Sequence, residues 1–206
     1  MPLYGSSVEY GLHCLIYLVN PPAPAGGDAG ETALAARDLA EFQGVSPSLV
    51  AKVFTKLQRA GLVESVEGKK GGYRLARDAA QISVLDVVDA IEGDKPLFDC
   101  KQIQGQCAVL DEQQPAATAR GACMIHTVML EAEQAMRRSL RSYTLAAMAQ
   151  GMTASMPPRF MNNMEAWFSE RMSGRAGRVL TDDSAGFLPA NEVRTSARRG
   201  AAGKRR

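Results

Sequence analysis

The stretch SPSLVAKVFTKLQRAG, residues 46–61, decides the fold. Ser46 is a typical helix N-cap, and Pro47 suits the first helical position because its missing N–H costs no hydrogen bond there. Apolar residues then recur at helical spacing until Gly61, a residue type that commonly ends helices. The outer face of this predicted helix carries three basic side chains: Lys52, Lys56 and Arg59. The stretch therefore predicts an amphipathic helix with a basic outer face.

The segments on either side of this helix complete a motif. A second helix is predicted at about residues 33–43, and Gly44 makes a tight turn between the two helices. Residues 62–66 and 72–75 read as two strands joined by the turn Gly68-Lys69-Lys70-Gly71. Two helices followed at once by a hairpin with a basic tip are typical of a winged helix-turn-helix, which binds DNA. We expect a mainly α fold with a small β-hairpin wing.

Two shorter helices are predicted beside the winged helix. Residues 7–19 carry an apolar stripe behind an N-cap at Ser6 or Ser7. Residues 84–92 follow the N-cap Ser83 and also have one apolar face. We expect both helices to pack their apolar faces into the core.

A longer helix is predicted over about residues 123–148. At roughly 1.5 Å per residue it would be about 39 Å long, which is more than a small domain can cover. We expect its apolar face to pack against a second copy in a two-fold dimer, as a reader of palindromic DNA requires. The alternative is a helix that folds back on its own domain. A short helix through residues 161–172 is expected to be a packing element.

These segments divide the chain into four parts. A winged helix-turn-helix domain with the N-terminal helix covers residues 1–93, and a loop without helical periodicity covers residues 94–122. A dimerisation helix follows over residues 123–150. Residues 151–206 form a C-terminal extension that we expect to be partly disordered, because its end is rich in Gly, Ala, Ser and Arg.

The charge is unevenly distributed along the 206 residues, although the net charge is only +2. Residues 37–77 hold eight basic and four acidic side chains, whereas residues 78–134 hold three basic and ten acidic ones. The chain from Arg194 onward carries six basic and no acidic side chains. The predicted winged helix can therefore meet a polyanion, and the acidic segment after it cannot.

The composition excludes several other classes of protein. Four cysteines are too few for a secreted disulfide framework, and the N-terminus lacks the features of a signal peptide. No apolar run approaches the roughly 20 residues of a membrane-spanning helix. We expect a cytoplasmic protein with reduced thiols and no membrane contact.

Cysteines gather in and after the loop. Cys100 and Cys107 lie within it, and Cys123 follows at its end. Thiolates are the usual protein ligands of iron–sulfur clusters, and imidazole can replace them. Glu9 and His13 are four residues apart, so they share one face of the N-terminal helix and can reach one centre together. This set predicts a cluster or metal site.

Other interpretations of these residues stay open. The cysteines could hold zinc, although the usual Cys-x2-Cys clip is missing, or they could form a thiol switch. A Cys–His nucleophile is disfavoured because no oxyanion-hole or phosphate-binding motif accompanies the thiols, so we expect no enzyme. Cys14 stands beside Leu15 and Ile16 and is expected to be a buried small hydrophobe.

Several strings together resemble the IscR/NsrR family of bacterial winged-helix iron–sulfur regulators. The resemblance covers roughly residues 1–150 and is carried by VEYGLHC at 8–14, VSPSLVAK at 45–52, GKKGGY at 68–73 and LDVVDAIEG at 85–93, together with the late cysteines. The Glu9 and His13 pair is most similar to the RsrR branch, whose members bind a [2Fe-2S] cluster.

The resemblance implies a dimer that shares the cluster between subunits. Cys100 and Cys123 of one subunit would bind it together with Glu9 and His13 of the partner subunit's first helix. Cys107 departs from the family spacing, so a three-cysteine set remains an alternative, as do a [4Fe-4S] cluster and zinc. His126, three residues after Cys123, is a further candidate ligand.

The resemblance also implies a transcriptional regulator whose recognition helix enters the major groove of double-stranded DNA, at a palindromic operator. Ser46 and Ser48 would contact bases or phosphates, and Lys52 and Lys56 would hold the backbone. The wing lysines, Lys69 and Lys70, would approach phosphates or a minor groove. Such a regulator would sense redox, nitrosative or iron status through its cluster. The alternative is a winged helix without a cluster, which uses a thiol switch or zinc.

Overall fold

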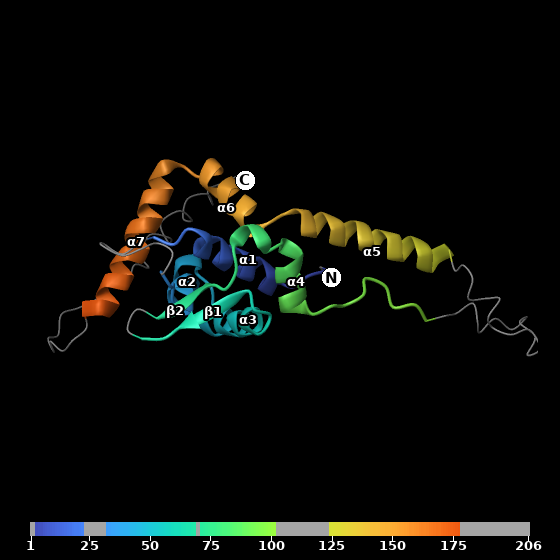
Figure 1. Cartoon of the computed structure of the whole chain (residues 1–206), viewed down its shortest axis with the longest axis horizontal. Coiled ribbons are helices and arrows are strands. Elements are labelled where there is room, and N and C mark those ends of the chain that lie inside the picture. The colour runs from blue at the N-terminus through green and yellow to red at the C-terminus, as the bar shows by residue number, and fades with distance from the viewer. Residues whose placement is uncertain (1–2, 23–31, 69–70, 102–123, 178–206) are drawn as a thin grey trace, which may run out of the picture.

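The computed structural model describes residues 3–22, 32–68, 71–101 and 124–177 (Figure 1). The disorder expected for the end of the chain concerns residues outside these ranges. Within them, no helix is both long enough and apolar enough to cross a bilayer.

The elements follow the expected order. The described helices are α1 (Ser6–Val19), α2 (Ala36–Gln43), α3 (Pro47–Arg59), α4 (Val84–Glu92), α5 (Met124–Ser142), α6 (Leu145–Ser155) and α7 (Pro158–Gly177). The strands β1 (Val63–Val66) and β2 (Gly72–Leu75) follow α3 as an antiparallel hairpin, and a short 3-10 helix (Ala79–Gln81) leads into α4. The mainly α fold with a hairpin wing is confirmed.

The helix-turn-helix forms through the local signals that predicted it. Pro47 is the first residue of α3, and Gly44 and Gly61 both adopt a φ of +67° at the ends of α2 and α3. The core stripe of α3 is buried: Val50, Val53, Phe54 and Leu57. Ser46 is the N-cap of α3 as predicted, although its hydroxyl accepts no capping hydrogen bond from a helix N–H and instead lies 2.9 Å from the Ser48 hydroxyl.

The wing is wider than a two-stranded hairpin, because Leu34 pairs with its outer edge. The Leu34 N–H donates to the Tyr73 carbonyl at 3.0 Å, and the Tyr73 N–H donates back at 2.8 Å. A side chain at Gly72 would place its Cβ 2.4 Å from the Leu34 carbonyl oxygen, so glycine is required there. This pairing holds residue 34 extended, which explains why α2 begins at Ala36 and not at about residue 33.

Helix α1 lies at the centre of the domain. Its buried side chains pack against α3, α4 and α6. A Cβ at Gly11 would lie 2.5 Å from Ile91 Cδ1 and 3.2 Å from Val53 Cγ1, so glycine lets the three helices approach closely. The N-cap position is Gly5, and neither Ser6 nor Ser7 caps the helix as predicted.

The single long helix expected over residues 123–148 is wrong. The chain leaves the helical path after Ser142, and Thr144 caps α6 by accepting the Ala147 N–H at 3.2 Å. The Val84 N–H donates to the Tyr143 carbonyl, and the Leu145 N–H donates to the Ile82 carbonyl, both at 2.9 Å. These bonds turn the chain back, so α6 packs on α1 while α5 extends away from the domain (Figure 1).

Helix α7 is longer than the predicted 161–172, and it is a packing element as expected. Its side chains cover an aromatic cluster on α1 and α2, in which Phe42 contacts Trp167 and Phe168 with ring centroids 5.2 Å and 4.9 Å apart. The Arg171 guanidinium lies 4.1 Å from the Trp167 ring centre and binds both oxygens of Glu41 at 2.5 and 2.7 Å. The extension is therefore docked on the helix-turn-helix.

Removing one ring of this cluster tests the docking of α7. Phe168 is 1% exposed, so Phe168→Ala should lower the free energy of unfolding by about 3–5 kcal/mol through lost burial and the cavity left behind. Urea unfolding followed by fluorescence measures this directly, because Trp167 is the only tryptophan. The control Glu165→Ala changes an exposed side chain of α7 and should shift stability by less than about 0.5 kcal/mol. Equal stability of the two variants would contradict the packing.

Candidate nucleic-acid interface and sensor segment

The outer face of α3 is open to solvent. Ser46 and Ser48 lie exposed at its start, and Lys52 follows one turn later. The Lys52 ammonium makes no hydrogen bond or ion pair with any residue that the structure describes. Arg59 is also exposed at the end of the helix. The face thus offers hydroxyl groups near the helix N-terminus and a free cation beside them, which suits contact with bases and phosphates.

Lys56 differs from Lys52, although both belong to the predicted basic stripe. The Lys56 ammonium donates a hydrogen bond of 2.6 Å to the main-chain carbonyl of Ile91, in the last turn of α4. This contact joins residues 35 apart in the chain, and the spacing of apolar residues gives no sign of it.

The charged side chains of the wing include an ion pair and an exposed carboxylate. Arg74 and Glu64 face each other across the hairpin and form an ion pair of 2.6 Å. Glu67, at the end of the first strand's side of the turn, is exposed. Lys69 and Lys70 lie outside the described residues, so their predicted DNA contacts remain predictions.

The predicted ligands on α1 point away from the core. Glu9 and His13 are both exposed, one turn apart on the face opposite to the buried stripe. Cys100 is half-buried near the end of its described segment, and Cys107 and Cys123 lie outside the described residues. Among the described residues of one protomer, no three Cys, His, Asp or Glu side chains are grouped closely enough to hold a metal ion. Glu9 and His13 are two of the four ligands that the resemblance implies, and the described residues bring no third ligand beside them.

Cys14 has the character expected of a core residue. Its thiol is buried and accepts a hydrogen bond of 3.2 Å from the Gln43 amide. Burial raises the pKa of this thiol to about 11, and the Gln43 bond lowers it only in part. The thiolate that a metal requires is therefore disfavoured at neutral pH. His126 is exposed in the first turn of α5, and its role as a ligand stays a prediction.

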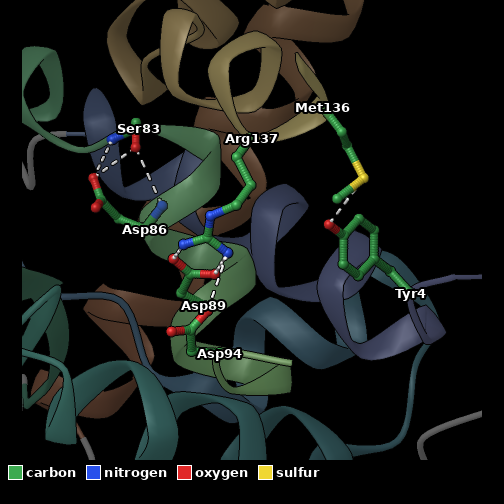
Figure 2. A network of polar contacts seen from close by, with 7 residues as sticks. All are labelled: Tyr4, Ser83, Asp86, Asp89, Asp94, Met136 and Arg137. Atoms are coloured by element: carbon green, nitrogen blue, oxygen red, sulfur yellow. Dashed lines mark hydrogen bonds and ion pairs between the residues drawn. The ribbon is translucent and has the colours of Figure 1, made fainter. Parts of the chain in front are cut away.

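A polar junction joins α5 to the end of α4 (Figure 2). The Arg137 guanidinium binds both oxygens of Asp89 at 3.1 and 2.8 Å and one oxygen of Asp94 at 3.3 Å. The Asp89 hydrogen bonds are the main cause of a raised pKa for Arg137. Glu133 adds a bond from the Leu97 N–H at 3.0 Å, at the start of the segment that leads to Cys100. Sequence reasoning missed this junction, since its partners are far apart in the chain.

The other half of α5 has no cover in the described residues. None of its side chains is buried, and the large apolar ones are exposed: Met124, Ile125, Val128 and Leu130. Met124 and Ile125 are 70% and 66% exposed. Met124, Ile125 and Val128 lie within about 100° of each other around the helix, so they share one side of it.

Comparison with known proteins places this arrangement in a family. A family model, "Rrf2: Iron-dependent Transcriptional regulator", matches residues 4–151. Protein rrf2 of Nitratidesulfovibrio vulgaris is 33% identical over 129 residues, which cover 63% of this chain and 78% of the relative. The family match ends within α6, so α7 lies beyond it.

Two solved structures share the fold. T. potens IscR matches with a TM-score of 0.54 at 25% identity, over 78% of this chain and 96% of that protein. CymR, the global cysteine regulator of B. subtilis, matches with a TM-score of 0.52 at 22% identity, over 73% of this chain and 98% of that protein. The expected kinship with winged-helix transcriptional regulators is thus confirmed at the level of the family. The family match over most of its length shows that the chain belongs to the Rrf2 family of transcriptional regulators.

Proposed function

We propose that this chain is a dimeric regulator that binds palindromic double-stranded DNA and controls that binding through a [2Fe-2S] cluster shared between subunits. The observation that carries the proposal is the incomplete ligand set on α1. Glu9 and His13 are exposed side by side, and one protomer offers no third ligand near them among the described residues. The resemblance to the RsrR branch supports Cys100 and Cys123 of a second subunit as the remaining ligands.

DNA binding is supported by the outer face of α3. The start of the helix presents Ser46 and Ser48, whose hydroxyls hydrogen-bond each other, and Lys52, which has no partner among the described residues. The opposite side of the helix is buried in the core. A helix held in this way can enter the major groove, where its N-terminal residues approach base edges. The wing lysines Lys69 and Lys70 would add contacts to phosphates on one side.

Dimerisation is supported by α5. Its exposed apolar side chains are large. They belong to an arm that extends from the domain (Figure 1). Two such arms packed about a two-fold axis would cover these side chains and would place two recognition helices for a palindromic site. A homodimer therefore explains both the apolar surface and the half ligand set.

The donor set fits an iron–sulfur cluster. Cys100 and Cys123 would supply two sulfur ligands, and Glu9 and His13 of the partner subunit would supply one oxygen and one nitrogen. A bound cluster would supply a redox-active centre. Through their bonds to it, these four residues would tie the 94–122 loop of one subunit to α1 of the other. Such a regulator would act in the cytoplasm, where the thiols remain reduced.

Within the family, the Glu9 and His13 pair supports the RsrR branch. The other ligand sets give different results in the experiments below. Participation of Cys107 would give a three-cysteine site or a [4Fe-4S] cluster, and zinc or a disulfide switch would leave no visible absorption from iron and sulfide.

The DNA-binding part of the proposal predicts a selective contact at Ser48. The wild-type protein should enrich a palindromic duplex from a random-sequence pool, with half-sites about 34–36 Å apart. Ser48→Ala should weaken binding to that duplex by about 1 kcal/mol and bind a scrambled duplex as the wild type does. Fluorescence anisotropy at fixed salt measures both affinities. Failure of the wild type to enrich any duplex would reject the DNA-binding role.

The proposed cluster can be tested by the visible absorption of variants that lack one of its cysteine ligands. Anaerobically purified wild-type protein should contain two iron and two sulfide per shared site and absorb visible light, and Cys100→Ala or Cys123→Ala should abolish that absorption. Cys14→Ala is the matched control, because its buried thiol is not a ligand in this scheme. Unchanged spectra in both loop variants would reject the assignment, and zinc by metal analysis would favour the alternative.

Sharing between subunits is tested by mixed dimers. One subunit carries Cys100→Ala and Cys123→Ala, and the other carries Glu9→Ala and His13→Ala. If the ligands come from both subunits, the mixed dimer keeps one intact site while each parent homodimer keeps none. If each subunit holds its own cluster, the mixed dimer has no intact site, and its iron content falls to background.

A further inference from the structure

One basic side chain of the recognition helix is already engaged within the protein. The Lys56 ammonium lies 2.6 Å from the Ile91 carbonyl oxygen, while Lys52, one turn earlier on α3, is exposed and has no partner among the described residues. Two lysines of one stripe therefore have different surroundings. Their roles in DNA binding need not be the same.

The acceptor of Lys56 is a group that needs a partner. Helix α4 ends at Glu92. The Gly93 N–H donates a hydrogen bond to the Asp89 carbonyl, and the Lys95 N–H donates to the Gly93 carbonyl. The Ile91 carbonyl is thus left without a main-chain donor at the negative end of the helix dipole. A lysine ammonium gives this carbonyl a hydrogen-bond donor and places a positive charge at the negative end of the helix dipole.

The same turn of α4 holds two other elements. Glu92 accepts a hydrogen bond of 3.0 Å from the Gly5 N–H, at the start of the helix that carries Glu9 and His13. Asp89 and Asp94 hold Arg137 of α5 (Figure 2). The end of α4 therefore joins the recognition helix α3 to α1, which carries the proposed cluster ligands, and to α5, the proposed dimerisation arm.

We propose that Lys56 is a positioning residue, which anchors the recognition helix α3 to the last turn of α4 and does not contact a DNA phosphate. Movement of α4 relative to α5 or α1 then reaches α3 through this anchor. The inference rests on the proposed DNA-binding function of α3 and replaces the phosphate contact predicted for Lys56.

A salt titration separates the two roles. Each lysine that neutralises a phosphate releases counterions, and its loss makes the slope of log K against log salt less negative by about 0.9. Lys52→Gln should show that change on the enriched duplex. Lys56→Gln should weaken binding roughly three- to tenfold through loss of one charge-assisted hydrogen bond, with the wild-type slope retained.

Two more variants guard against a purely structural effect. Lys56→Arg can still donate to the Ile91 carbonyl and should restore affinity, while Lys56→Met keeps most of the side-chain stem and should behave like Lys56→Gln. Hydrogen exchange of the free protein should show faster exchange at the end of α3 in Lys56→Gln and Lys56→Met, and no change in Lys52→Gln.

The results of these titrations distinguish failure of the positioning role of Lys56 from failure of the proposed DNA binding. A slope change for Lys56→Gln equal to that of Lys52→Gln, or wild-type affinity in Lys56→Gln and Lys56→Met, overturns the positioning role while DNA binding stands. If the wild type binds no duplex selectively, the proposed function and this inference fail together. If Lys56→Gln is too unstable to titrate, Lys56→Met alone decides by the same slope.

Discussion

The burial of α1 in the middle of the domain is the constraint on which the rest of the structure depends. One face of this helix packs against α3, α4 and α6, and Gly11 allows that approach because any Cβ there would press on Ile91 and Val53. Glu9 and His13 lie on the other side of its first turns and are exposed. The same packing thus supports the recognition helix from behind and presents the proposed ligands to a partner.

The second determinant is the pair of main-chain hydrogen bonds between residues 82–84 and 143–145. They stop α5 after Ser142 and return the chain to the core as α6. An uninterrupted helix would have carried α6 and α7 away from the domain. Because the chain turns back, α5 alone becomes the exposed arm, and α7 reaches the aromatic cluster on α2.

These contacts show what individual charged residues within the acidic and basic segments of the sequence bind. The acidic segment that begins after the wing includes Asp89, Glu92 and Asp94, and these carboxylates bind Arg137 and the Gly5 N–H. Part of the acidity therefore holds elements together and does not serve only to repel DNA. The basic stripe of α3 is likewise divided, since Lys52 is free among the described residues and Lys56 is held by α4.

The sequence by itself determined the winged helix-turn-helix, because its signals are local. The residues Pro47, Gly44, Gly61 and Ser83 act within one turn of their own position, and the strand pattern of the wing needs only its own hairpin. The same local reasoning correctly placed Cys14 inside and Glu9 and His13 on one face.

Only the tertiary structure decided where helices stop for non-local reasons and which polar groups meet. Leu34 delays α2 by pairing with Tyr73, and residues 143–145 break the predicted long helix by pairing with residues 82–84. Arg137 meets Asp89 across 48 positions, and Arg171 meets Glu41 across 130. Hydrogen bonds and ion pairs of this kind depend on distances in space that chain spacing does not encode, whereas caps and periodicity depend on neighbours that it does.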